Sequence, residues 1–344
     1  SVLLAGCLSA CAPSPNDRPA PARADIREAE VTRGFHVAPH GRDGSAGTID
    51  RPWRTLTAAL SRLHAGDTLW VHDGVYQERI DITASAGRPD ARITVAPFPG
   101  DRPLLRGMLW LGEPSYWTIE GLRVTSDEQH SPDKAMVRLY GGTGWVLRNS
   151  ELFGARSVAA LMIDDGPRQN LGEFAVRENC IHDTAPSNGQ NQDHNIYVDD
   201  FGASPAPHGV IERNVIFNAP NGNNVKLGGG NGGGPRNVEV RFNSMLGANR
   251  NVSLSIGATG NQVSRNLLMW AREANVFAFD LTGLGNAVYD NLTFASASPV
   301  GRSDTSAPVW FDRNLVRDPK IDAVSCTGLR PTGSELRYGR YATR

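Results

Sequence analysis

Lysine, long apolar runs and net charge are what this 344-residue sequence has least of. Three of the 35 cationic side chains are lysines, at Lys134, Lys226 and Lys320, so each lysine can be weighed individually for function. The formal net charge of −1 at pH 7 provides no global basic field, so we do not expect nucleic acid as a partner. No stretch reaches the about 18 continuous apolar residues of a transmembrane helix, so we expect no membrane span.

Cysteine is also scarce, and its four copies fall into two pairs. Leu4-Ala5-Gly6-Cys7 fits the lipobox of bacterial lipoproteins, which predicts lipidation of Cys7 and an exported protein of the cell envelope or the medium. Residues 12–33 are typical of a flexible tether, so membrane contact is expected only through the lipid anchor. Export would permit a disulfide between Cys180 and Cys326, but the sequence does not show that they meet, and a buried Cys180 thiol is the alternative.

One pattern is abundant: a large apolar residue, two mostly polar residues and an asparagine recur seven times between residues 146 and 314. The asparagines are 30, 35, 29, 23, 25 and 23 residues apart, which is typical of one turn of a solenoid. Glycine, asparagine and β-formers are too frequent in the unit for a helical repeat. The copies end at Asn149, Asn179, Asn214, Asn243, Asn266, Asn291 and Asn314.

Asparagine at one fixed place in each turn is typical of a parallel β-helix. Its side-chain amide can donate to one neighbouring turn and accept from the other, and its backbone tolerates the left-handed conformation of a sharp corner. The apolar residue three positions earlier would point into the coil and stack on its copies. We therefore predict an all-β fold, a single-stranded parallel β-helix of roughly eight to nine coils.

An amphipathic helix is expected before the repeats. Leu56, Ala59, Leu60 and Leu63 fall at i, i+3, i+4 and i+7 and form one apolar face. Such a helix would close the open N-terminal end of a solenoid core, which must be covered to stay soluble.

Three regions are predicted along the chain. A signal remnant and tether would occupy residues 1–33, the β-helix residues 34–325, and a C-terminal tail or cap residues 326–344. Within the tail, Leu329, Leu336 and Tyr338 could shield the last coil.

The N-terminal part of the predicted β-helix also resembles a known family. The stretch Ala65-Gly66-Asp67-Thr68-Leu69-Trp70-Val71, with Phe35-His36-Val37-Ala38-Pro39 before it and Ile93-Thr94-Val95-Ala96-Pro97 after it, resembles the start of the pectate-lyase-like right-handed parallel β-helix superfamily. The resemblance covers about residues 34–320 and implies a right-handed coil. It says little about chemistry, because the superfamily includes lyases, hydrolases, epimerases and binding proteins.

A second strand can be read in most coils, and its middle residue should face outward. In-register stacking would place Arg138, Met162, Tyr197, Lys226, Ser253 and Phe277 in one outward column, about 4.8 Å apart. Loops at 183–193, 200–208 and 228–235 would form walls beside this column and create a groove for a chain-like ligand. A second asparagine run at Asn195, Asn224 and Asn251 is either another corner ladder or part of a polar face, and we predict that these residues and Arg138 bind substrate.

Lys226 is the centre of this column. Eliminative cleavage of a uronic-acid polysaccharide needs a base for the proton on C5, neutralisation of the adjacent carboxylate and an acid for the leaving oxygen. A lysine can be the base if desolvation or a nearby cation lowers its pKa. The resemblance implies a lysine or arginine base, often with Ca²⁺ held by acidic side chains. The candidates are then Lys226 as base, Tyr197 or His194 as acid, and Asp164, Asp165, Asp193, Asp199 and Asp200 as calcium ligands.

Other functions are compatible with the same residues. Lys226 could be a solvated residue paired with Asp199, which would contribute little to stability. A non-catalytic carbohydrate-binding or adhesion solenoid needs only the groove, and an epimerase would use a similar base and acid. A glycoside hydrolase needs carboxylates at a fixed separation, for which Asp164, Asp199 and Asp200 are available. The preferred prediction is a monomeric polysaccharide lyase that acts on an acidic polysaccharide at the cell surface.

Overall fold

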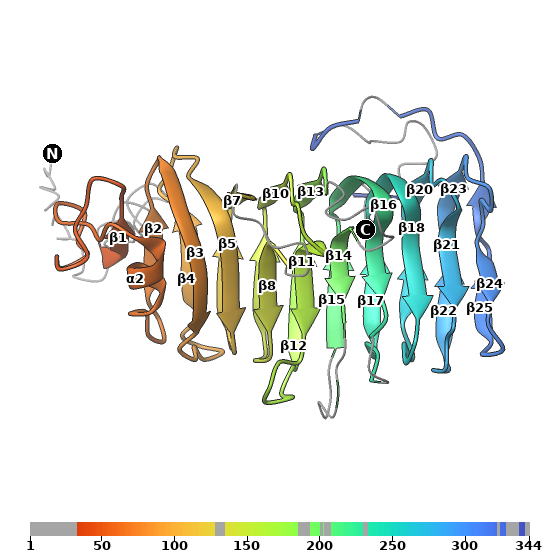
Figure 1. Ribbon diagram of the computed structural model, residues 1–344, viewed down its shortest axis with the longest axis horizontal. Helices are drawn as coiled ribbons and strands as arrows, with labels where there is room; N and C mark the ends of the chain where they lie inside the picture. The colour runs from red at the N-terminus through yellow and green to blue at the C-terminus, as the bar shows by residue number, and fades with distance from the viewer. Residues whose placement is uncertain are drawn as a thin grey trace, which may run out of the picture. The chain divides into compact units, whose positions relative to one another are not determined.

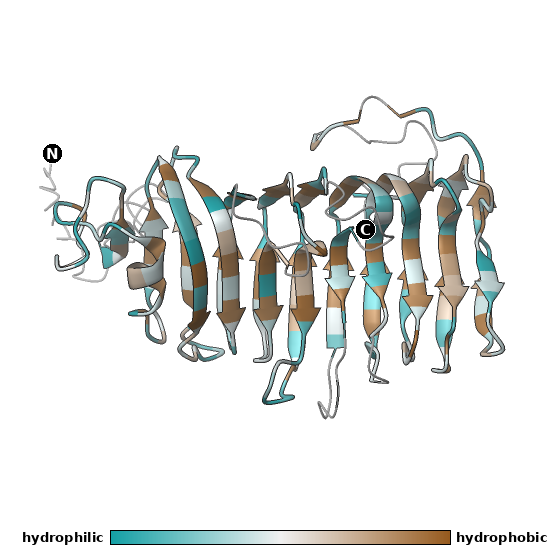
Figure 2. Cartoon of the chain, in the orientation of Figure 1, coloured by the Kyte–Doolittle hydropathy of each residue, from teal (hydrophilic) through white to brown (hydrophobic). Residues whose placement is uncertain are grey.

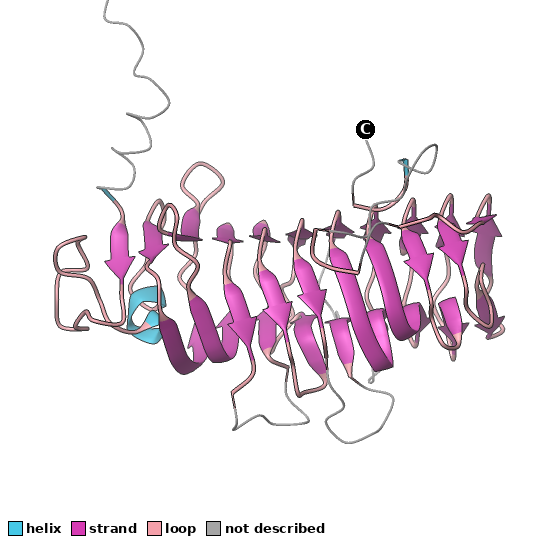
Figure 3. Ribbon diagram, turned by 90° about the horizontal axis from the view of Figure 1, so that it is seen from above, coloured by secondary structure: helices cyan, strands magenta, loops and turns pink. Residues whose placement is uncertain are grey.

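The computed structural model is built almost entirely of short parallel strands stacked in coils (Figures 1 and 3). It describes residues 33–127, 135–184, 193–199, 202, 208–229, 233–321, 324–327 and 337–340. The chain divides into two units, Ser1–Arg33 and Gly34–Arg344, and the description below concerns the second. The predicted lipidation site Cys7 and the tether lie outside the described residues. Across the described ranges, no helix is long and apolar enough to span a membrane.

The first sheet provides one strand to each coil. Within the described ranges it contains eleven parallel strands, more than the eight to nine coils predicted, because its first strands carry no asparagine motif. In spatial order the strands are β1 (Phe35–Val37), β2 (Thr68–Val71), β4 (Ile93–Pro97), β6 (Trp117–Glu120), β9 (Trp145–Arg148), β12 (Glu173–Arg177), β15 (His208–Glu212), β17 (Val238–Arg241), β19 (Gln262–Ser264), β22 (Asn286–Tyr289) and β25 (Val309–Asp312).

The second sheet consists of two strips joined by long strands. The first strip contains β7 (Arg123–Thr125), β10 (Glu151–Phe153), β13 (Cys180–His182), β20 (Leu267–Met269), β23 (Leu292–Phe294) and β26 (Leu315–Val316). The second strip contains β8 (Val137–Tyr140), β11 (Ala159–Asp164), β14 (His194–Val198), β21 (Ala274–Phe279) and β24 (Arg302–Asp304). The strands β3 (Val75–Thr83), β5 (Leu104–Gly112), β16 (Val215–Leu227) and β18 (Ser244–Ser255) are long, and the last three pair with strands of both strips.

Strict alternation of side chains produces the apolar interior, visible as alternating brown and teal bands along the strands in Figure 2. Ile196, Val225, Val252 and Val276 stack in register on the second strip and are all 0 % exposed. The helix expected near residue 56 is α2 (Leu56–Leu60), where the Thr55 side chain accepts a hydrogen bond from the N–H of Ala58. Its buried leucines belong to the main core, and its role as a seal of that core stays a prediction.

An asparagine ladder runs along the corner between the first sheet and the first strip. Nδ2 of Asn179 donates to Oδ1 of Asn214 at 3.0 Å, and the same bond recurs at 2.9 to 3.0 Å along the column. The predicted ladder is therefore confirmed from its second to its seventh member. The remaining members are Asn243, Asn266, Asn291 and Asn314.

Two details of the predicted ladder are wrong. Val176 pairs with Leu147, not with Val146, so the ladder position of that coil is Ser150, whose N–H donates to Asn179, and Asn149 lies outside the ladder. The left-handed conformation belongs to the residue before each ladder asparagine, such as Glu178 with φ 56°. The asparagine side chain must point inward to reach its neighbours, so the corner turns one residue earlier.

Two described parts of the C-terminal tail, residues 324–327 and 337–340, contact the outside of the first strip. Tyr338 belongs to an apolar cluster with Val215, Leu246 and Leu267, and a disulfide joins Cys326 to Cys180 of β13. Leu315 of the last coil also packs against this cluster, and the prediction that the tail shields the last coil stays a prediction. Leu329 and Leu336 lie outside the described residues.

Candidate functional site

An outward column on the second strip brings the predicted chemistry together. Tyr197 pairs with Lys226, and Lys226 with Ser253, on the successive strands β14, β16 and β18. Met162 and Phe277 continue the column on either side, and Arg138 follows beyond Met162. The predicted register is confirmed, and Lys226 extends from the outer face of the coil.

The amine of Lys226 lies against the ring of Tyr197. Its Nζ is 4.4 Å from the ring centroid, a cation–π distance, and the Tyr197 hydroxyl donates to Oδ1 of Asp199 at 2.8 Å. Burial lowers the pKa of Lys226, and although the charge of Asp199 opposes this, the Arg250 guanidinium lowers the pKa further. A lowered pKa increases the neutral fraction of the amine, which a general base requires.

Arg250 is a functional candidate that the sequence reasoning missed. It precedes Asn251 on β18, and its side chain is 12 % exposed with Nε bonded to Glu273 at 2.7 Å. Its guanidinium carbon lies 4.4 Å from the ring centroid of Phe277 and 4.7 Å from that of Phe279. An oriented, partly desolvated guanidinium suits recognition of a carboxylate. Strict alternation from the inward Val252 would have placed Arg250 inward, and nothing in the sequence pattern distinguished it from the other arginines.

Three buried polar atoms of the described chain have no hydrogen-bond partner and lie close to this column: Nε2 of His194, Oδ1 of Asn223 and Oγ of Ser253. Ser253 is the strand partner of Lys226, and Nδ1 of His194 accepts from the Asn223 backbone N–H at 3.1 Å, so Nε2 carries the ring proton. Leaving such an atom unpaired costs about 1–3 kcal/mol. Water or a polar ligand bound at this surface would offset that cost.

His194 does not have the exposure of an acid catalyst. It is 1 % exposed, and burial, with added repulsion from Lys226 and Arg250, holds its pKa well below the ordinary value. Its ring meets that of Tyr197 edge-on at 5.3 Å, so it supports the tyrosine from behind. The prediction of His194 as the acid is wrong in this arrangement, and Tyr197 remains the candidate.

The second asparagine run is a buried corner ladder. Nδ2 of Asn195 donates to Asn224 at 2.8 Å, and Nδ2 of Asn224 donates to Asn251 at 2.7 Å. All three side chains are 0 % exposed, and their amides also bond backbone carbonyls. The prediction that Asn195, Asn224 and Asn251 bind substrate is therefore wrong, and the alternative of a structural ladder is correct.

The predicted calcium ligands do not converge. Asp164 makes two 2.7 Å hydrogen bonds with Arg138, which lies between the rings of Trp110 and Tyr140. Among the described residues, the acidic, histidine and cysteine side chains close enough to share a metal ion are Cys180, His182 and Cys326, and no aspartate belongs to that group. The predicted aspartates that the structure describes form no such group, and calcium binding stays a prediction.

Three predictions remain open at this face. Asp200 and most of the segments expected to form walls, at 185–192, 203–207 and 230–232, lie outside the described residues. The predicted calcium ligands Asp165 and Asp193 are buried, at 7 % and 0 % exposed. Substrate binding by Arg138 stays a prediction, since its guanidinium is engaged by Asp164.

A cavity of about 990 Å³ lies elsewhere, over the N-terminal coils, beside Arg79, Arg106 and Phe153.

Comparison with known proteins places the fold. No family model matches the sequence. The crystal structure of pectate lyase Pel9A has a TM-score of 0.57 at 12 % identity, covering 84 % of this chain and 80 % of that one. The complex of XylC with xylose has a TM-score of 0.58 at 14 % identity, covering 82 % of this chain and 69 % of that one.

Curated proteins match over shorter segments. Pectate lyase PEL9 of Emericella nidulans is 31 % identical over 83 residues, which is 24 % of this chain and 20 % of that protein. The uncharacterized protein YwoF of Bacillus subtilis is 32 % identical over 75 residues, or 21 % of this chain and 15 % of that protein. The matches thus span a fifth or less of these relatives' length. The likeness to these solved structures shows that this chain has the same fold, a parallel β-helix.

Proposed function

We propose that this protein is a polysaccharide lyase that cleaves a uronate-containing polysaccharide by β-elimination, with Lys226 as the base. The observation that carries the proposal is a partly buried lysine of lowered pKa on an outward column, with a second cation and unpaired polar atoms beside it. The two similar proteins that are named as pectate lyases support the same reaction class.

In the proposed reaction, the neutral amine of Lys226 removes the proton from C5 of a uronate ring. Arg250 on the next strand binds the carboxylate attached to C5 and stabilises the negative charge that develops there. The C4–O bond breaks as the C4=C5 double bond forms, and the Tyr197 hydroxyl transfers its proton to the leaving oxygen. Asp199 holds that hydroxyl in position through the 2.8 Å hydrogen bond. Proton exchange with solvent then restores the neutral amine and the phenol.

We also propose an exported monomer attached to the cell envelope through a lipid on Cys7. The disulfide between Cys180 and Cys326 supports export, because such bonds persist in oxidising compartments. Replacing Cys7 by serine should release the protein from the membrane fraction of the producing cells. Retention of the C7S variant in that fraction would exclude Cys7 as the anchor.

The test of activity follows the ultraviolet absorbance of unsaturated uronates. Pectate, alginate and glycosaminoglycans are offered in turn, with and without a chelator. Lys226→Ala should lower kcat by about 10²–10⁴-fold, as expected for loss of a general base. The matched control is Lys320→Ala, since the Lys320 side chain is 77 % exposed and pairs with Asp318 away from the column.

The outcomes separate the candidate functions. New reducing ends without new absorbance would indicate a glycoside hydrolase, and binding without either would indicate a carbohydrate-binding protein. Full activity of K226A would remove Lys226 as the base even in a genuine lyase. Loss of activity in the chelator would indicate that a bound cation takes part.

A further inference from the structure

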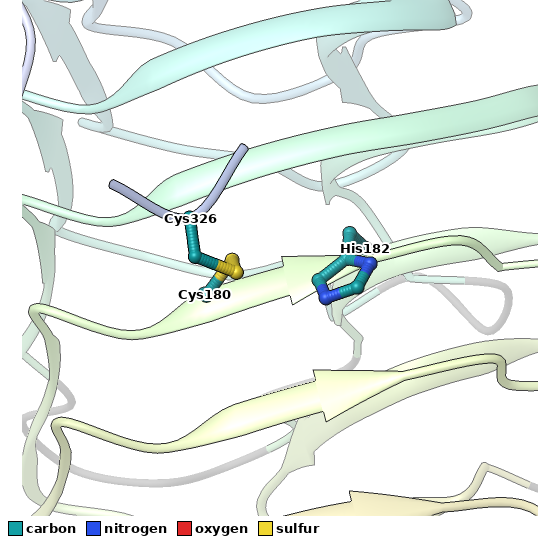
Figure 4. Close-up of side chains that lie close together, drawn as sticks. All are labelled: Cys180, His182 and Cys326. Carbon is teal, nitrogen blue, oxygen red and sulfur yellow. A yellow bond between two sulfur atoms is a disulfide. The ribbon is translucent and has the colours of Figure 1, made fainter. Parts of the chain in front are cut away.

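A second group of reactive side chains lies on the first strip, where the C-terminal tail crosses it (Figure 4). Cys180 and His182 are two positions apart on β13 and both face outward, because the intervening Ile181 is 0 % exposed in the core. Cys326 comes from the tail and is disulfide-bonded to Cys180. The ligand atoms of these three residues lie within 4.8 Å of one another.

The imidazole of His182 is held in a fixed orientation. Its ring stacks between Phe217, at a centroid distance of 4.7 Å and an angle of 5°, and Phe153, at 5.7 Å and 14°. Nδ1 lies 2.7 Å from Oδ2 of Asp183. A carboxylate on one ring nitrogen is the usual arrangement of metal-binding histidines, because it directs the other nitrogen towards the ion.

The other ring nitrogen faces the sulfur atoms and a second carboxylate. Nε2 of His182 is buried and has no hydrogen-bond partner, and Oε1 of Glu151 is 3.6 Å away. Glu151 is the strand neighbour of Cys180, and its Oε1 is 3.9 Å from Sγ of Cys326. Two sulfurs and one nitrogen therefore lie close enough to share one ion, a ligand set suited to Zn²⁺, and the Glu151 carboxylate lies beside two of these three residues.

We propose that reduction of the Cys180–Cys326 disulfide creates a Zn²⁺-type metal site formed by both thiolates and Nε2 of His182, with Glu151 or water as the fourth ligand. A dithiol reductant supplies two electrons and two protons, becomes a cyclic disulfide and leaves two thiols. Metal binding then releases both thiol protons. The broken bond lets the sulfurs separate to the about 3.8 Å that tetrahedral Zn–S bonds of 2.3 Å require.

The site would give the tail two alternative attachments. In the oxidised protein the disulfide holds the tail against the first strip, next to the cluster that contains Tyr338. In the reduced protein the metal would connect the same two positions. The tail would then detach only when the protein is both reduced and free of metal.

The experiment uses the full chain with Cys7 and Cys11 replaced by serine, because these residues could also bind metal. Co²⁺ and Zn²⁺ are added to oxidised and dithiol-reduced samples after removal of the reductant under anaerobic conditions. We expect a thiolate-to-cobalt charge-transfer band and one Zn²⁺ per chain in the reduced sample alone. Cys326→Ser should abolish the band. His182→Ala should weaken Zn²⁺ binding by more than about tenfold and Asp183→Asn by about tenfold.

The matched control is His208→Ala, because the exposed His208 on β15 also lies near a carboxylate, Glu239, but far from any cysteine in sequence. It should leave binding unchanged. The thermal unfolding of each oxidised variant checks that it folds. Absence of the band after reduction, equal binding by the oxidised sample, or unchanged affinity in both H182A and D183N would overturn the proposal.

Discussion

Replacing Asn243 by alanine tests the asparagine ladder against a control with the same local sequence pattern. Oδ1 of Asn243 accepts from the backbone N–H and from Nδ2 of Asn214 at 3.0 and 2.9 Å. Its Nδ2 donates to the carbonyl of Ile211 at 2.8 Å and to Oδ1 of Asn266 at 3.0 Å. Alanine removes all four bonds from a site that is 0 % exposed.

The expected loss in the free energy of unfolding comes from the two backbone groups whose side-chain partner is removed. Nδ2 of Asn214 still bonds Val176, and Oδ1 of Asn266 still accepts from the Asn243 backbone. The N–H of Asn214 and the carbonyl of Ile211 lose the bonds described above. At about 1–3 kcal/mol for each buried group left unpaired, Asn243→Ala should lower the free energy of unfolding by roughly 2–6 kcal/mol.

Asn149→Ala is the matched control, since Asn149 ends the same motif but is exposed, and the described partner of its side chain is Glu120. It should cost only about 1 kcal/mol, which comes from placing alanine at the left-handed φ of 51° that asparagine tolerates. Urea unfolding of the disulfide-intact proteins, followed by far-ultraviolet circular dichroism, measures both variants. Equal losses, or a loss below about 1 kcal/mol for Asn243→Ala, would refute the one-residue offset and the importance of the ladder.

Three further predictions concern the proposed site and the tail. Only the neutral amine of Lys226 accepts a proton, and burial lowers its pKa. The kcat/KM of the lyase reaction should therefore rise with pH and level off below the ordinary lysine range. A pH profile without this rise would contradict Lys226 as the base. Arg250→Met removes a cation that lowers the pKa of Lys226, so the rise of kcat/KM should move to higher pH. The value of kcat/KM near neutrality should fall by about 100-fold or more. An unchanged pH profile would show that Arg250 takes no part in catalysis. Cys326→Ser removes the disulfide between positions 146 residues apart and should lower the free energy of unfolding by about 2–5 kcal/mol. Urea unfolding measures this loss against a Cys11→Ser control. Equal stability of the two variants would show that the disulfide of the tail adds nothing to stability.

Much of the scaffold was predictable because a coil repeats its constraints. An asparagine recurring once in each turn identified the solenoid, and alternation within each strand placed Lys226 outward beside Tyr197. The same reasoning misjudged Asn195 and Asn224, because a ladder asparagine and a ligand-binding asparagine look alike in sequence. Only the side-chain bonds within the corner distinguish them.

The contribution of Arg250 was not predictable for a related reason. Its effect on Lys226 depends on two side chains from neighbouring coils, and arginine is frequent throughout the chain. The metal-compatible group around His182 likewise required the path of the tail, which carries no repeat that could indicate where Cys326 would lie.

The stacked coils and the inward or outward direction of most strand residues follow from short-range periodicity that every turn repeats, so both could be predicted. The tertiary structure alone decided which polar atoms are satisfied, which residue occupies the corner near Asn149, and which strip the tail covers. Those outcomes depend on contacts between residues far apart along the chain, and local spacing places no restriction on such contacts until the coils are stacked.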